Sequence, residues 1–392
     1  MIPFTAAIDL LLDHAPLLDA ENCLLEDACG RVLRAGIRTD RPFPPFDRVM
    51  MDGYALRAAD LLLNRGFHIT GTAPAGRPAA TLSRVPGSCV EVMTGAPLPL
   101  GADCIVPVEE IVRQGEDQII VAATFRAVAG QFIHRAGSDA GEGEWLLMPG
   151  TRMGSREIGV AASCGAAWLE VTRPPRIAVL TTGDELVPVG ATPAPHQIRQ
   201  SNGHAIRAAL ARAGYPSGDG GTLGDDTDGA DLRGIIEAND WILLTGAVSK
   251  GARDFLPAML DSLDCKRLFH GVAQRPGKPA GCWLGSAGQM IVALPGNPVS
   301  ALTALHVLVL SGLAAASGLI LPAPRQVAPH APLSQLPGMT LHLPVTLDAD
   351  GQAMAAATGN SGDFTGLLRS DGILTVPPRG TTRGTFPYIP WL

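Results

Sequence analysis

From about residue 175 onward, apolar runs alternate with polar turns in a regular order. Three runs of apolar and β-branched residues, at 176–181, 241–245 and 290–294, each end abruptly in a turn rich in Gly, Asp, Ser or Pro. Continuous apolar runs of this length are typical of strands that are buried on both faces. Stretches with helical spacing lie between them, so the pattern predicts a mostly parallel sheet with helices on both faces.

The predicted helices have end signals in the sequence. Asn202 is expected to cap a helix whose apolar residues recur at helical spacing until Gly214, where a glycine ends the helix. Helical spacing also recurs at 232–236 and at 255–263. In a sheet of this kind ligands bind at the carboxyl ends of the strands, so we expect the three strand-end turns to converge at one site.

A longer apolar stretch, 299–321, carries no formal charge. Its length alone would allow it to span a bilayer. Because it contains His306, several Ser and Thr residues and many Ala residues, and directly follows a predicted strand and turn, we expect a buried helix instead.

The first 170 and the last 70 residues show a different pattern, in which short apolar runs are separated by Gly and Pro turns. The predicted strands lie at 90–93, 104–108, 118–121, 341–345 and 372–376. Such runs are typical of β-rich modules. The segment 322–332 is expected to be a linker that enters a small C-terminal β-domain.

Composition and charge narrow the class of protein. The chain has 392 residues, enough for two or three domains, and 46% hydrophobic residues supply a core. The formal net charge is -7 and no run of Lys or Arg occurs, which argues against a nucleic-acid partner. Seven scattered cysteines, with Asp9 and Asp13 interrupting the first apolar stretch, predict mostly buried thiols and a cytoplasmic protein without a signal peptide.

The strand-end turns carry the candidate chemistry. A Gly-rich backbone before a helix presents N–H donors that favour an anion, and Arg275 and Lys278 add two cations on a nearby turn. Asp184, Glu185 and Asp225 place carboxylates beside this anion site, a combination that is typical of Mg²⁺. Each feature also has a purely structural interpretation, since similar turns occur on ordinary surfaces and Asp often caps helices.

Motifs of several common enzyme classes do not occur in the sequence. The nine histidines show no HExxH or HxH spacing, so we expect no zinc site. There is no GxSxG elbow, and no GxGxxG turn opens a helix. These absences argue against a serine hydrolase and against a Rossmann dehydrogenase.

Six motifs, taken together, resemble one enzyme family. They are 46–55 (FDRVMMDGYA), 93–103 (MTGAPLPLGAD), 182–186 (TGDEL), 248–254 (VSKGARD), 276–279 (PGKP) and 295–300 (PGNPVS). Their type and order are similar to those of the molybdopterin molybdenumtransferases, the MoeA-type family that includes the E domain of gephyrin. The resemblance spans about residues 3–380.

The resemblance implies a mostly parallel α/β domain of the molybdopterin-binding type, joined to discontinuous β-rich subdomains and a small C-terminal β-domain. The expected parts are 1–20 with 171–320, 21–40 with 140–170, 41–139, and 321–392. The part at 41–139 is expected to face the partner subunit of a homodimer.

The resemblance also implies an activity. Members of the family insert molybdenum from molybdate into adenylylated molybdopterin with Mg²⁺, releasing AMP and the molybdenum cofactor. Molybdate and adenylylated molybdopterin are therefore the expected substrates, and Mg²⁺ is the expected cofactor. The expected partners are a second copy of the chain, the molybdopterin adenylyltransferase in a transient complex, and apo-molybdoenzymes or their chaperones, with no nucleic acid and no membrane.

The motifs also indicate which residues of this chain occupy the positions of the family's functional residues. The resemblance implies catalytic roles for Asp52, Asp139, Asp184, Asp225, Asp254 and Lys278. It implies substrate contacts for Thr182, Gly183, Glu185, Ser249, Lys250, Arg275, Gly277, Pro295, Gly296, Asn297 and, by a looser match, Ser361. It implies metal binding by Asp184, Glu185 and Asp225, while Asp52 and Asp139 would come from the partner subunit.

Three positions depart from the family pattern. Ala247 stands where Gly is common, Lys250 where a small or apolar residue is common, and Gln200 where Asp is common. These departures leave the choice between molybdate and tungstate open. Two alternative functions also remain at this point: a molybdopterin adenylyltransferase, and a non-catalytic molybdopterin carrier or scaffold.

Overall fold

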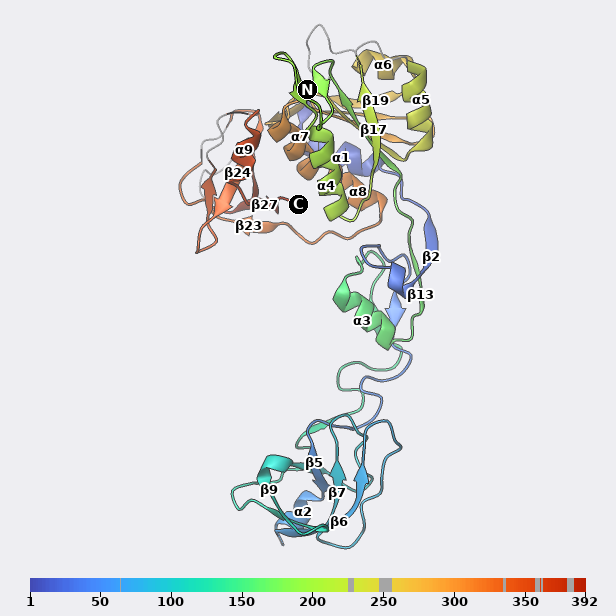
Figure 1. Ribbon diagram of the computed structural model, residues 1–392, viewed down its shortest axis with the longest axis vertical. Coiled ribbons are helices and arrows are strands. Elements are labelled where there is room, and N and C mark those ends of the chain that lie inside the picture. The colour runs from blue at the N-terminus through green and yellow to red at the C-terminus, as the bar shows by residue number, and fades with distance from the viewer. Residues whose placement is uncertain are drawn as a thin grey trace. The chain divides into compact units, whose positions relative to one another are not determined.

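The computed structural model describes residues 1–63, 65–224, 229–246, 256–333, 336–356, 360, 362–378 and 384–392. Contacts within the chain define two compact units (Figure 1). The larger unit consists of Met1–Ala35, Pro149–Ile158 and Trp168–Leu392, and the smaller unit of Gly36–Met148 and Gly159–Ala167. Each unit is described by itself.

The larger unit is built around the predicted parallel sheet. Its strands, in spatial order, are β17 (Gly218–Leu223), β14 (Ile177–Thr182), β18 (Trp241–Thr245), β22 (Met290–Leu294), β21 (Gly281–Leu284) and β19 (Lys266–His270). The first four of these run parallel, and β21 and β19 add antiparallel pairs at one edge. The predicted strands at 241–245 and 290–294 are confirmed with both ends in place.

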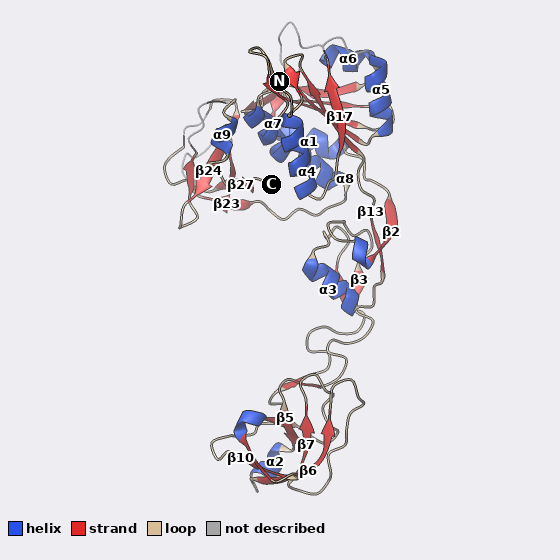
Figure 2. Cartoon of the chain, viewed as in Figure 1, coloured by secondary structure: helices blue, strands red, loops and turns tan. Residues whose placement is uncertain are grey.

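Helices cover both faces of this sheet, as predicted (Figure 2). One face packs against α1 (Phe4–His14), α4 (Asn202–Arg212), α7 (Pro298–Ala304), η3 (Leu305–Val309) and α8 (Leu310–Ala316). The other face packs against α5 (Gly229–Ala238) and α6 (Leu256–Ser262). Alternate residues of β14 serve the two cores: Ile177 and Val179 on the first face, Ala178 and Leu180 on the second.

The long apolar stretch is a buried helix, as predicted. It runs without a break through Pro298–Ala316 and includes a π-helical turn at Leu305–Val309. It is long and apolar enough to cross a membrane by length and composition alone, but most of it is buried inside the larger unit. Its burial against the sheet accounts for its apolar character without a lipid phase.

The last part of the chain forms a second sheet that takes in strands from elsewhere. Its strands are β23 (Arg325–Val327), β24 (Thr340–Leu347), β25 (Ala353–Ala355), β26 (Gly372–Val376), β27 (Phe386–Pro390), β20 (Val272–Arg275) and β1 (Ile2–Pro3). The predicted linker at 322–332 is wrong in part, because β23 lies within it and pairs with β27. The sequence did not predict β23 because a strand of three residues is too short to show the alternation of apolar and polar residues that marks a strand.

The smaller unit is β-rich, as predicted. Its main sheet has the order β8 (Cys104–Pro107), β5 (Gly53–Leu56), β7 (Ser88–Val92), β6 (Gly66–Ala73), β10 (Gln118–Val121) and β9 (Ile111–Gln114). Two short pairs complete it: β4 (Arg48–Val49) with β11 (Ile133–His134), and β3 (Ile37–Arg38) with β12 (Trp145–Leu147). In the larger unit, β2 (Ala20–Leu24) pairs with β13 (Trp168–Thr172).

Candidate functional site

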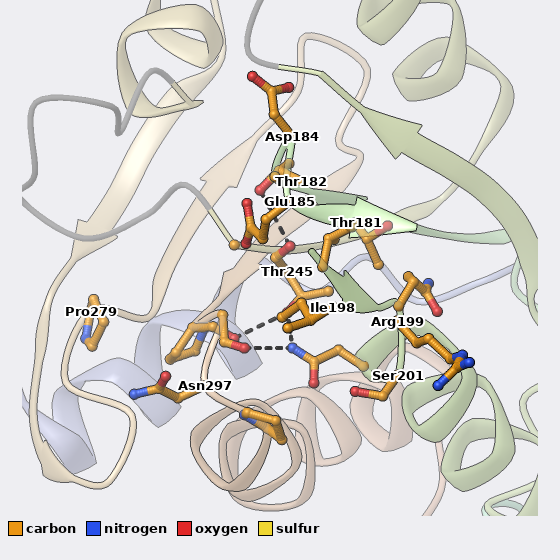
Figure 3. Close-up of a pocket in the computed structure, with 18 of the residues that line it drawn as sticks. Thr181, Thr182, Asp184, Glu185, Ile198, Arg199, Ser201, Thr245, Pro279 and Asn297 are labelled. Atoms are coloured by element: carbon orange, nitrogen blue, oxygen red, sulfur yellow. Dashed lines mark hydrogen bonds between the residues drawn. The ribbon is translucent and has the colours of Figure 1, made fainter. Parts of the chain in front are cut away.

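A cavity of about 870 Å³ opens where the parallel strands end (Figure 3). The end of β14 and the residues after it line the cavity from Thr181 to Leu186. Thr245, the last residue of β18, and Gly246 line it next, and the residues after β22 line it from Pro295 to Pro298. The predicted convergence of the strand-end turns is therefore confirmed for the described residues. The cavity lining includes seven residues to which the resemblance assigns substrate, metal or catalytic roles: Thr182, Gly183, Asp184, Glu185, Pro295, Gly296 and Asn297.

Two of the turns touch directly through a glycine. Gly246 has φ +105°, and a Cβ atom there would lie 2.4 Å from Thr182 Oγ1 and 2.6 Å from the Thr182 carbonyl oxygen. The Gly246 N–H donates to the carbonyl of Leu294 at 3.1 Å, which ties the end of β18 to the end of β22. Glycine is required at this position because both the conformation and the space exclude a side chain.

Asn202 joins the same turns through its side chain. Its Nδ2 donates to Thr245 Oγ1 (3.1 Å) and to the carbonyl oxygen of Gly296 (2.7 Å), while Thr245 Oγ1 donates to the carbonyl of Pro295 (3.0 Å). The prediction that Asn202 caps a helix is wrong: Ser201 holds the N-cap position, Asn202 is the first residue of α4, and Asn202 Oδ1 accepts no hydrogen bond from the described residues. The side chain instead links the start of α4 to the ends of two strands, β18 and β22.

The carboxylates of Asp184 and Glu185 follow β14 directly and line the cavity. They point in different directions from the strand end, with Glu185 beside Thr182 and Asp184 turned away from it (Figure 3). Among the described residues, no group of three or more His, Cys, Asp or Glu side chains is arranged to hold a metal ion. One or two carboxylates with retained water are the usual protein share of a Mg²⁺ site, so Asp184 and Glu185 fit that ion.

The predicted cations lie elsewhere on the surface of the larger unit. Arg275, at the end of β20, and Lys278 are exposed, and neither they nor Gly277 line the cavity. Pro279, the residue after Lys278, does line it. The turn therefore borders the cavity without placing its cations among the lining residues.

Asp52 and Asp139 belong to the smaller unit. Asp52 accepts hydrogen bonds from the backbone N–H (2.7 Å) and the hydroxyl (2.8 Å) of Thr94, which lower its pKa. Asp139 accepts from His134 Nε2 (2.7 Å) and Ser138 Oγ (3.1 Å), and these bonds likewise lower its pKa. Both side chains are therefore held in place as carboxylates on the surface of their own unit.

Five predicted site residues lie outside the described residues: Asp225, Ser249, Lys250, Asp254 and Ser361. The structural effect of Ala247 lies outside them as well.

Other cavity residues were not expected from the sequence as site residues. His196, Ile198 and Arg199 line the cavity from the segment between β14 and α4, together with Gln200 and Ser201. The buried Gln200 Oε1 and Asn202 Oδ1 have no hydrogen-bond partner among the described residues. The sequence signals were their place just before a helix that follows a strand-end turn and, for Gln200, its departure from the family pattern.

Comparisons with known proteins agree with this architecture. The family model described as the MoeA N-terminal region (domain I and II) matches residues 2–165, and the probable molybdopterin binding domain matches residues 178–315. The solved structure of a molybdopterin biosynthesis moeA protein from Pyrococcus horikoshii OT3 is similar over 100% of both chains, with a TM-score of 0.81 and 25% identity. The chain thus has the fold of these molybdopterin biosynthesis proteins.

Two curated relatives extend the likeness in sequence. The molybdopterin molybdenumtransferase of Synechocystis sp. is 32% identical over 100% of both chains. Molybdopterin molybdenumtransferase 2 of Mycobacterium tuberculosis is 36% identical over 78% of this chain and 76% of its own length. The chain belongs to the molybdopterin molybdenumtransferase family; it is a transferase of molybdenum cofactor biosynthesis.

Proposed function

We propose that the chain inserts molybdate into adenylylated molybdopterin in a Mg²⁺-dependent reaction that releases AMP and the molybdenum cofactor. The observation that carries the proposal is the composition of the cavity. Two helices, α4 and the helix that begins at Pro298, start at its wall beside the carboxylates of Asp184 and Glu185. Helix N-termini attract phosphate and oxoanions, and a carboxylate beside them attracts the cation that accompanies the anion.

The cavity also suits a substrate of this size. Pockets for small molecules and cofactors occupy about 300–1,000 Å³, and this cavity of about 870 Å³ is near the upper end. The buried acceptor oxygens of Gln200 and Asn202 offer positions for N–H or O–H groups of an organic ligand. A molybdopterin nucleotide carries both kinds of group, anionic phosphates and N–H and O–H donors.

Asp184 and Glu185 would hold Mg²⁺. The ion would offset the charge of the polyanionic substrate and polarise the phosphoanhydride as a Lewis acid. Arg275 and Lys278, on the turn that borders the cavity, would hold molybdate near the dithiolene sulfurs, and Asp52 and Asp139 of a second copy would complete the site. We propose a cytoplasmic homodimer that receives its substrate from the adenylyltransferase and delivers the cofactor to apo-molybdoenzymes or their chaperones.

The test is AMP release from the purified protein loaded with adenylylated molybdopterin and Mg²⁺, measured with and without molybdate. Molybdate-dependent AMP release, coupled to activation of an apo-molybdoenzyme, is the expected result. Synthesis of the adenylate from ATP would instead support an adenylyltransferase. Tight binding of molybdopterin without AMP release would support a carrier, and either result would overturn the proposal.

A further inference from the structure

A buried chain of polar side chains connects the C-terminal sheet to the turn that carries Arg275 and Lys278. His342, on β24, lies between Thr375, on β26, and Gln274, on β20. His342 Nδ1 is 3.2 Å from Thr375 Oγ1, and His342 Nε2 is 3.2 Å from Gln274 Oε1. Gln274 Nε2 donates to the carbonyl oxygen of Gly277 at 3.0 Å.

The Gly277 carbonyl, the last group in this series of hydrogen bonds, determines which of the other groups donate and which accept. A carbonyl oxygen can only accept, so the Gln274 amide must present its NH₂ group to Gly277 and its oxygen to His342. The ring must then donate from Nε2, which leaves Nδ1 to accept the hydroxyl proton of Thr375. The ring is neutral because burial lowers the pKa of His342 to about 3.

Backbone hydrogen bonds from the Val272 N–H to the Lys278 carbonyl (2.8 Å) and from the Gly271 N–H to the Ala280 carbonyl (2.9 Å) close the base of the turn, and the Gln274 side chain closes its tip. Pro276 has no N–H, and Gly277 has φ +94°. The Gln274 side chain spans the turn from its first residue to its fourth, and a Cβ atom at Gly277 would lie 2.7 Å from Gln274 Nε2. Gln274 and His342 are both 0% exposed, so water cannot replace either partner.

We propose that Thr375, His342 and Gln274 form a positioning network that holds the turn bearing Arg275 and Lys278 ready to receive an oxoanion. The network lets β24 and β26 set the place of two cations that precede β24 by more than sixty residues in the sequence. None of the three side chains touches the substrate; they act through the backbone of Gly277. The proposal rests on the proposed function, because it takes Arg275 and Lys278 as ligands of molybdate.

The test compares two substitutions of one residue. His342→Gln keeps an N–H donor near the position of Nε2, whereas His342→Leu removes it and leaves Gln274 Oε1 unpaired. His306→Leu is the matched control: His306 is another buried histidine of the larger unit, 4% exposed, with hydrogen bonds to the Leu302 carbonyl and from the Leu392 N–H. Loss of either histidine lowers stability, so only effects specific to the turn count.

The first readout is hydrogen exchange of the peptide that covers residues 272–284, which does not depend on activity. The Ala280 N–H donates to the Gly277 carbonyl at 3.1 Å and reports directly on the turn. We expect at least fivefold faster exchange in His342→Leu, exchange within twofold of the parent in His342→Gln, and no local change in His306→Leu. Unchanged exchange in His342→Leu would overturn the proposal.

The second readout is the KM for molybdate in AMP release. We expect a KM raised about tenfold in His342→Leu with a much smaller change in kcat, recovery in His342→Gln, and the parent KM in His306→Leu. A KM raised equally in both Leu variants, or faster exchange without any change in KM, would overturn the proposal. A parent protein without molybdate-dependent AMP release would overturn the proposed function instead, and the role of Arg275 and Lys278 with it.

Discussion

The side-chain amide of Asn202 donates a 2.7 Å hydrogen bond to the backbone carbonyl of Gly296, joining the start of α4 to the turn after β22. A second bond from the same nitrogen reaches Thr245 at the end of β18. One amide group therefore holds together segments that are 43 and 94 residues away in the sequence. The side chain of Asn202 therefore connects two segments of the cavity wall.

Asn202→Asp replaces the donor with a carboxylate oxygen of nearly the same shape. The carboxylate would face the Gly296 carbonyl without a proton between them, so we expect a loss of about 1–3 kcal/mol in stability and a large loss of activity. Thermal unfolding and AMP release measure the two effects. Asn239→Asp is the control, because Asn239 Nδ2 donates to the Ile235 carbonyl away from the cavity; equal activity losses in the two variants would contradict the assignment.

Gly246→Ala tests the contact between the first two strand-end turns. The new Cβ would collide with backbone and side-chain atoms of Thr182, so we expect roughly 3 kcal/mol of destabilisation or more, together with loss of ligand binding. Gly221→Ala is the matched control: Gly221 also has positive φ (+83°), but a Cβ there meets nothing within 4 Å. That variant should lose only about 1 kcal/mol. Similar melting temperatures in the two variants would rule out the steric argument.

Lys278→Ala should weaken the use of molybdate more than the binding of molybdopterin. Loss of one charge-assisted hydrogen bond, about 1.5–3 kcal/mol, corresponds to a tenfold or larger rise in KM for molybdate. Steady-state AMP release at varied molybdate concentration measures this, and equilibrium titration measures binding of the pterin. Lys266→Ala, on exposed β19, removes a lysine away from the turn and should leave both values unchanged. The same dependence on molybdate in Lys278→Ala and in the parent would exclude the role.

Glu185→Gln should raise the Mg²⁺ concentration needed for half-maximal activity, because a neutral amide is a weaker ligand for a hard cation. AMP release at varied Mg²⁺ concentration measures the change. Glu237→Gln is the control, since Glu237 is an exposed residue of α5. An unchanged Mg²⁺ requirement in Glu185→Gln would remove this carboxylate from the metal site.

Asp240 stabilises the larger unit at the opposite ends of the same strands. It receives hydrogen bonds from Arg173 (2.7 and 3.0 Å) and Arg176 (2.8 Å from the backbone N–H). Burial acts to raise the pKa of this carboxyl, but the two arginines outweigh it and hold the pKa well below its usual value. Asp240→Asn would remove the main counter-ion of both arginines and leave Arg173 only its longer contact with Asp19 (3.6 Å), so we expect a loss of about 3 kcal/mol at neutral pH.

The pH dependence of this effect has a definite sign. The folded pKa lies below the unfolded value of about 3.9, so the stabilisation is present above that pH and is lost as the pH falls toward the folded pKa. The gap in melting temperature between the parent and Asp240→Asn should therefore be wide at pH 7 and should start to shrink only below about pH 4, closing as the pH approaches the folded pKa. Asp219→Asn, in an exposed pair with Arg207, should shift stability by about 0.5 kcal/mol or less at every pH. A constant gap for Asp240→Asn would contradict the ion-pair explanation.

The sequence by itself determined the parallel sheet and the edge of it at which a cavity opens. The strands at 241–245, 290–294, 118–121 and 372–376 agree with the structure at both ends. Their apolar runs and the turns that follow them are local properties, because a strand buried on both faces must be apolar throughout and the chain must turn where it ends. The sequence also identified Thr182, Glu185 and Asn297 as neighbours, since parallel strands end at one edge.

The tertiary structure alone decided how the strand ends are held together. The roles of Asn202, Gln274 and His342 depend on partners far away in the sequence, and a single polar residue has no period that could reveal them. The pairing of β1 and β20 with the C-terminal sheet is equally invisible, because strands of two to four residues are stabilised by their neighbours and not by their own pattern. Periodicity gives the elements, and packing gives the contacts between them.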